Sequence, residues 1–320
     1  MLLRSLGALA VVAASLALLP VARAAPYPAR TIEIIVPYGA GGSTDFVART
    51  IAQRLQERLG QAVVVLNRPG GSGTIGVGTA MRANPDGYTL LLSYTSELVV
   101  VPQVNKNVKY SVEDFTPIAV TGIVPVVLIV SKTVRADTMP DLIEEIRQSP
   151  GKYTFSGGLG SPSHILGSWL NQLKQLEARH VPNRDGAQSV ADVVGGHIDM
   201  FYGGTSVVKP AIESGSVKAI AIAGVRSSSM PNVPTFKEAG LADFELASWN
   251  VMLAPKGTPA DIVQLLKKEV LAILGEPQVR KVLADSGVEA SATQDVTAFL
   301  ARERDKFGQV VRSLGITIGQ

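Results

Sequence analysis

A glycine-rich turn between an apolar run and a helix pattern is the first stretch that could hold a ligand. In VPYGAGGSTD the apolar run stops at Pro37, and three glycines follow within four residues. A helix N-terminus offers unpaired N–H groups and a partial positive charge, and glycines let a carboxylate or phosphate come close. A glycine turn without a ligand is the alternative. We predict an anion contact through Tyr38, Ala40, Gly41, Gly42, Ser43, Thr44 and Asp45.

Two side chains of this turn have expected roles at the start of the helix. Ser43 or Thr44 is of the type that caps a helix N-terminus. Asp45 would lie in the first turn, where the helix dipole favours a negative charge. We expect Asp45 to stabilise that turn, and contact with a ligand ammonium group is the alternative.

A second turn of the same design occurs in YTFSGGLGSPSHIL, where a strand pattern, glycines and a helix pattern follow one another. Ser161 suits the N-cap, and Pro162 suits the first helical position, where its missing N–H is tolerated. His164 either donates to an anion or is a structural histidine. If the two turns face each other, two helix N-termini bind one carboxylate from both sides, or one dicarboxylate. The candidates here are Ser156, Gly158, Gly160, Ser161 and His164.

Polar residues also stand where predicted strands end, which is where ligands bind in open α/β sheets. The segment LLSYTSE ends in Ser93, Tyr94 and Thr95, and Tyr202 follows the strand in HIDMF. These hydroxyl groups would bind a ligand without adding charge; ordinary polar loops are the alternative. Arg184 in HVPNRDG could pair with a carboxylate through two hydrogen bonds, or it could be solvated.

Patterns for other chemistry are weak. GSGTIG at residues 71–76 follows a strand, and Glu97 lies about twenty residues on, as in dinucleotide-binding sites; the helix after it is short, however. The sequence has no G-x-S-x-G and no cysteine, and its three histidines are scattered. We therefore predict no metal, no cofactor and no enzymatic activity. A secreted α/β hydrolase or oxidoreductase is the rival interpretation.

The elements that would position these turns alternate between strand and helix after residue 30. Strand patterns at 31–38, 62–67 and 88–93 enclose a helix at 44–59, which predicts a mostly parallel sheet covered by helices. A second block begins at residue 125 and a third near residue 249. We expect an α/β protein of two lobes, formed by residues 25–124 with 248–320 and by residues 125–247. Hinges would lie near residues 122–125 and 247–251.

The N-terminus and the composition suggest export. Arg4 precedes an apolar run at residues 6–19, and Ala22-Arg23-Ala24 is a small-x-small site, so we expect a signal peptide cleaved after Ala24, with an uncleaved anchor as the alternative. Without Arg4 and Arg23 the chain has 28 basic and 27 acidic residues, a net charge of +1. A nearly neutral chain is not expected to bind nucleic acid or anionic lipid. These features favour a bacterial periplasm.

The order of motifs is similar to that of the Bug family, the periplasmic solute-binding proteins of tripartite tricarboxylate transporters. The blocks YPARTIEIIVPYGAGGSTDFVARTIAQRL, VVVLNRPGGSGTIG, NPDGYTLLL, FSGGLGSPSH, GGHIDMFY and APKGTPADIV carry the resemblance, which covers essentially the whole chain after residue 24. It implies a two-lobed Venus flytrap, type II-like, that holds a small carboxylate through backbone amides. Carried over by motif, the two glycine turns are residues 38–45 and 156–164.

The resemblance also implies partners. A monomeric receptor would deliver its ligand to membrane permease subunits, or would act on a sensor kinase as an orphan receptor. One stretch departs from the family, where Asn183-Arg184-Asp185-Gly186 replaces the usual turn with an aromatic residue after HVP. We therefore expect a changed contact at the cleft, and the ligand of a known relative cannot be transferred directly.

Overall fold

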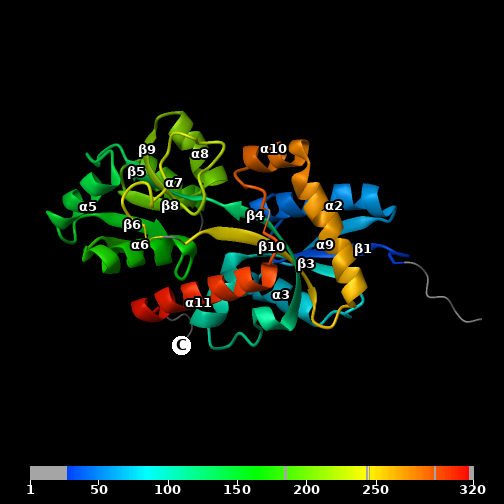
Figure 1. The fold of residues 1–320 in the computed structure, drawn as a ribbon. Coiled ribbons are helices and arrows are strands. Elements are labelled where there is room, and N and C mark those ends of the chain that lie inside the picture. Colours follow the sequence, from blue (N-terminus) through cyan, green and yellow to red (C-terminus); the bar gives the residue numbers. More distant parts are fainter. Residues whose placement is uncertain (1–26, 184–185, 243, 245, 292, 317–320) are drawn as a thin grey trace, which may run out of the picture.

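The computed structural model describes residues 27–183, 186–242, 244, 246–291 and 293–316. They form two lobes joined at the centre of the molecule, each built on one five-stranded sheet (Figure 1). The first sheet has the order β2 (Val63–Asn67), β1 (Ile32–Val36), β3 (Thr89–Tyr94), β10 (Ser248–Pro255) and β4 (Phe115–Val124). The second has the order β7 (Arg179–Pro182), β6 (Thr154–Gly157), β8 (Met200–Gly204), β5 (Val126–Ser131) and β9 (Val217–Ala223). The two-lobed α/β fold is confirmed.

Each sheet is mixed, because the strand that follows each crossing between the lobes runs antiparallel to its neighbours. β1 pairs in parallel with β2 and β3, and β6 pairs in parallel with β7 and β8. β10, which returns from the second lobe, is antiparallel to β3 and β4. β5, which enters from the first lobe, is antiparallel to β8 and β9. Both sheets therefore contain two parallel and two antiparallel pairs, which local strand patterns do not reveal.

Helices cover both faces of the first sheet. The apolar spacing predicted a helix at 44–59, and α2 spans Ser43–Leu59, with Val47, Ile51 and Leu55 fully buried. Gly60 ends it in the left-handed conformation. α2 packs on one face with α9 (Ala260–Gly275) and α10 (Pro277–Asp285). The other face carries α3 (Thr74–Met81), the π-helical turn η2 (Ser96–Val100), α4 (Val101–Val104) and α11 (Val296–Leu314). Two short 3-10 turns are η1 (Gly71–Gly73) and η3 (Val112–Asp114).

The second sheet is covered in the same way. α5 (Met139–Arg147) and α6 (Pro162–Lys174) pack on one face, and α7 (Gly186–Val194) and α8 (Thr205–Glu213) pack on the other. Among the described helices, none combines the length and the apolar character that crossing a membrane would need.

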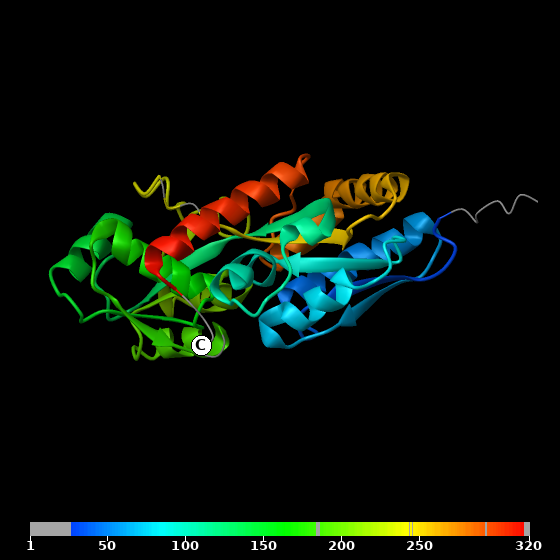
Figure 2. The ribbon, with the colours of Figure 1, turned by 90° about the horizontal axis from the view of Figure 1, so that it is seen from below.

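Two crossing strands, the helix α11 and a shared apolar core connect the lobes. The chain passes from β4 to β5 at Pro125 and returns with β10, which pairs with β4 up to Ser248 and Val124. α11 lies along both lobes (Figure 2). Ser313 at its end exchanges two hydrogen bonds with Gln172 of α6 in the second lobe, at 2.8 and 3.0 Å. One apolar core is continuous through this side of both lobes.

Candidate ligand-binding cleft

A cleft of about 630 Å³ lies between the two lobes and has walls from both. Helices cover the two faces of each sheet, so the strand ends and their loops remain open. The loops of one lobe can therefore face those of the other. The first lobe contributes Tyr38, Gly39, Gly42, Ser43, Thr44, Tyr94, Ser96 and Val124. The second lobe contributes Pro162, Gly186, Gly204, Ser206 and Val207. The two predicted turns therefore do meet across one cleft.

Four helices begin at this cleft, where the sequence predicted two. α2 begins with Ser43 and α6 with Pro162, as expected. α7 begins with Gly186, and Ser206 is the second residue of α8. The stretch YGGTS, which runs into α8, repeats the order of glycines and hydroxyl residues in GGST, which runs into α2, and this signal could have identified the start of α8. Together the four N-termini bring partial positive charge from both lobes to one space.

The start of α2 differs from the expected capped helix. Gly42 occupies the N-cap, and no side chain caps this helix. Thr44 instead uses its hydroxyl to donate to Oδ1 of Asn250 in β10, at 3.1 Å. The expectation that Ser43 or Thr44 caps α2 is therefore wrong, because the Thr44 hydroxyl has a partner in the crossing strand. Without a side-chain cap, the first N–H groups of α2 stay available to a ligand.

Asp45 holds the first turn in shape. Its buried carboxylate accepts from the N–H of Gly41 at 2.9 Å, from Nδ2 of Asn67 at 2.9 Å and from Nε of Arg49 at 2.9 Å. Burial opposes ionisation of Asp45, but the hydrogen bonds from Arg49, Gly41 and Asn67 lower its pKa. Gly41 has a φ of +89°, which favours glycine at this position. These bonds favour a structural role for Asp45 over contact with a ligand ammonium group.

The second turn is fixed by a cap and by a histidine. Ser161 caps α6 by accepting from the N–H of His164, at 3.3 Å. Nδ1 of His164 accepts from the N–H of Gly160 at 3.0 Å, and the His164 ring stacks on His180. Burial, with a smaller effect of His180, lowers the pKa of His164 to about 4. His164 is therefore neutral at pH 7 and holds the turn through Nδ1.

Two tyrosines of the first lobe, Tyr38 and Tyr94, line the cleft. The Tyr38 hydroxyl donates to Oε2 of Glu97 at 2.5 Å, and the Tyr94 side chain bonds to Ser248. Burial is the largest cause that raises the pKa of Tyr94, to about 12. Both hydroxyls are committed to protein groups.

The remaining described candidates lie outside the lining of the cleft, as do Asp45, Gly160, Ser161 and His164. Ala40, Gly41 and Gly158 belong to the two turns, while Ser156 bonds to Ser189 of α7 at 2.9 Å. Ser93 bonds to Glu97, and Thr95 bonds to the backbone of Trp249. Tyr202 is 2% exposed, and its carbonyl accepts from Ser163. The hydrogen bonds of these residues connect the loops of the cleft to the protein interior. Arg184 lies outside the described residues.

The described lining contains no charged side chain. Among the described residues there is also no group of three His, Asp or Glu side chains that could hold a metal ion. An anion in this cleft would meet N–H groups and hydroxyls of the described residues.

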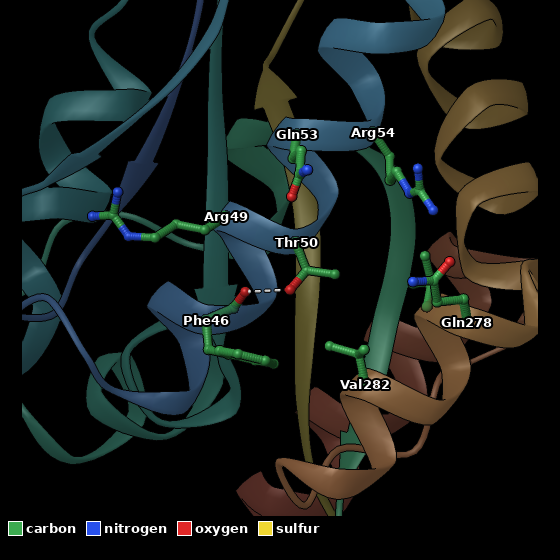
Figure 3. Close-up of a pocket in the computed structure, with 8 residues that line it drawn as sticks. Phe46, Arg49, Thr50, Gln53, Arg54, Gln278 and Val282 are labelled. Carbon is green, nitrogen blue, oxygen red and sulfur yellow. Dashed lines mark hydrogen bonds between the residues drawn. The ribbon is translucent and has the colours of Figure 1, made fainter.

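A second groove, of about 530 Å³, lies between α2 and α10 (Figure 3). It is lined by Phe46, Arg49, Thr50, Gln53, Arg54, Gln278, Val279 and Val282, all from the first lobe. Its two arginines already have carboxylate partners, Asp45 for Arg49, and Glu57 and Glu276 for Arg54. Closure of the lobes could not enclose a ligand here, so this groove is a poorer candidate than the cleft.

The sequence and the fold of this chain are similar to those of known receptor proteins. The family model described as "Tripartite tricarboxylate transporter family receptor" matches residues 47–316. Protein BugT of Bordetella pertussis is 36% identical over 295 residues, which are 90% of each chain.

Two solved structures are similar over nearly the whole chain. An R. palustris protein solved with adipate has a TM-score of 0.79 at 31% identity, over 91% of this chain and 99% of that one. The periplasmic binding protein BugD has a TM-score of 0.75 at 30% identity, over the same shares. The family match, the identity to BugT and the two-lobed cleft show that this chain belongs to the Bug family, the tripartite tricarboxylate transporter receptors.

Proposed function

We propose that this protein binds a small mono- or dicarboxylate between its lobes and delivers it to the membrane permease subunits of a tripartite tricarboxylate transporter. The observation that carries the proposal is the convergence of four helix N-termini on a cleft whose described lining has no charged side chain. Hydrogen bonds from N–H groups to a carboxylate are worth about 1.5–3 kcal/mol each, so three of them supply about 4.5–9 kcal/mol, a range that includes the roughly 8 kcal/mol of micromolar binding. The similar protein that was solved with adipate supports a carboxylate as the ligand class.

Closure of the lobes would turn binding into a signal. A ligand that contacts α2 and the second-lobe helices stabilises the closed arrangement, because it binds that arrangement better than the open one. We propose that residues 25–124 with 248–320 and residues 125–247 are the two moving bodies, with hinges near residues 122–125 and 247–251. The closed shape would then be recognised by the permease.

The place of action follows from the family. We propose that the chain is exported to the periplasm, that its signal peptide is cleaved after Ala24, and that it acts there as a monomer without enzymatic activity. Mass spectrometry of the secreted protein would test cleavage after Ala24, and its hydrodynamic size would test the monomeric state.

The test of the ligand class is calorimetry at pH 7 with succinate, adipate and benzoate, and with the uncharged analogues succinamide and adipamide. We expect at least one carboxylate to bind with micromolar affinity or better, and its amide to bind at least 100-fold more weakly. Equal binding of acid and amide, or binding of a neutral sugar instead of every carboxylate, would overturn the proposal.

A further inference from the structure

Glu97 is a fully buried carboxylate directly behind the cleft. It follows Ser96, which lines the cleft, and it accepts from the hydroxyl of Tyr38, which also lines it. Ser93 Oγ donates to Oε1 of Glu97 at 2.8 Å, and the N–H of Tyr94 donates to the same oxygen. Three donors from two strand ends therefore meet on one acid.

The glycines of GSGTIG make room for this acid. A Cβ added to Gly73 would lie 2.7 Å from Cβ of Glu97, and one added to Gly76 would lie 2.7 Å from Cα of Pro37. Both distances are too short for real side chains. The motif that resembles a dinucleotide fingerprint therefore packs against Glu97 and against the residue before Tyr38, and its spacing is explained without a nucleotide.

No positive side chain bonds to Glu97 in the described structure. The titratable groups that face it are Tyr38, Tyr94 and Tyr110, whose hydroxyl donates to the Glu97 carbonyl at 2.7 Å. From α11, which packs on η2, Glu303 accepts from Trp249, and Arg304 pairs with Glu113 and Asp305. Burial raises the pKa of Glu97 to about 7, against the lowering effect of its hydrogen bonds. Glu97 therefore loses its proton at a higher pH than an exposed glutamate does.

We propose that Glu97 is a positioning residue of the cleft, which holds the Tyr38 hydroxyl away from the ligand and takes up a proton when an anion is bound. The physical reason for the coupling is that a carboxylate in the cleft is a like charge on the far side of Tyr38 and Ser96, and it disfavours ionised Glu97. The coupling rests on the proposed function, whereas the positioning of Tyr38 does not.

The first experiment needs no ligand. The side-chain carboxyl carbons of glutamate are followed by 13C NMR as the pH is varied, in the wild type and in Glu97→Gln. One resonance should titrate near pH 7 and should vanish in Glu97→Gln, but should persist in the matched control Glu113→Gln, whose side chain is 52% exposed. Titration of every glutamate below pH 5.5 would overturn the proton uptake proposed for Glu97.

Tyr38→Phe is the second variant, in case Glu97→Gln does not fold. It removes one of three donors to the Glu97 carboxylate, so the resonance near pH 7 should move to higher pH. A resonance that does not move in Tyr38→Phe would show that the two side chains are not coupled.

The second experiment uses adipate and succinate as probes, in calorimetry at pH 7.5 in buffers of different ionisation enthalpy. Binding to the wild type should take up a fraction of a proton, and affinity should fall about tenfold from pH 6 to pH 8.5, since a repulsion of about 1.4 kcal/mol between like charges corresponds to about one pKa unit. Glu97→Gln should show neither effect. The same uptake and slope in Glu97→Gln would overturn the coupling.

Binding that fails altogether has a separate meaning. If neither these probes nor any other carboxylate binds the wild type, the proposed function fails and the coupling fails with it. The comparison of the Glu97 resonance in the wild type and in Tyr38→Phe then still decides whether Glu97 holds Tyr38.

Discussion

Replacement of Ser43 by proline tests whether backbone N–H groups bind the ligand. Ser43 is the first residue of α2, where proline is tolerated because no intrahelical bond is lost. Gly42 before it has φ −76° and ψ 168°, an extended conformation that a following proline accepts. The substitution therefore removes one N–H group at the cleft and keeps the helix.

The expected loss follows from one charge-assisted hydrogen bond. Such a bond is worth about 1.5–3 kcal/mol, which corresponds to a fall in carboxylate affinity of about 10- to 150-fold. Ser43→Ala is the matched control, because it keeps the N–H and removes only the hydroxyl, and it should lose less than about fivefold. Urea unfolding should place both variants within about 1 kcal/mol of the wild type.

Calorimetry with the tightest-binding carboxylate distinguishes the possible results. Binding by Ser43→Pro that equals the wild type would refute the role of the α2 N-terminus. An equal loss in both variants would instead assign the contact to the Ser43 hydroxyl and would contradict binding through the backbone.

Three further results are expected. Asp45→Asn should lower the free energy of unfolding by about 2–3 kcal/mol at pH 7, whereas Arg49→Gln, which removes its exposed partner, should lower it much less. The Asp45 contribution should be lost only as the pH falls through its lowered pKa, and equal losses for the two variants in urea unfolding would contradict this. The His164 contribution should be complete above pH 6.5 and decline as the pH falls from 6.5 toward 4, because the unfolded imidazole takes a proton first; an NMR titration of His164 near pH 6.5 would be the contrary result. Gly287→Ala should weaken carboxylate binding at least tenfold, because Gly287 has a φ of +81° and an added Cβ would lie 2.7 Å from the backbone nitrogen of Ser206 in α8. The control Gly275→Ala, whose Cβ would meet open space, should bind as the wild type does. Equal binding by both variants would count against a contact between the ligand and the start of α8.

The sequence predicted those features that local chemistry determines. Apolar residues at a spacing of four and Gly60 determine α2 and its end, and the glycine turns mark the two helix N-termini that meet at the cleft. Such signals depend on neighbours within about ten residues, so they can be read without knowledge of the fold.

The remaining features depend on residues far apart in the chain. Thr44 uses its hydroxyl on Asn250, 206 residues away, so the expected cap does not form. Glu97 was of interest only for its distance from GSGTIG, and its burial behind Tyr38 depends on how β3 packs beside β1. The antiparallel direction of β5 and β10 depends on the crossings between lobes, which local strand patterns do not determine.

A crystal structure with a bound carboxylate would test the central claim most directly. We predict carboxylate oxygens within about 3 Å of backbone nitrogens at the start of α2 and of at least one of α6, α7 and α8. A carboxylate held only by arginine or lysine side chains, or seated in the groove between α2 and α10, would contradict the account.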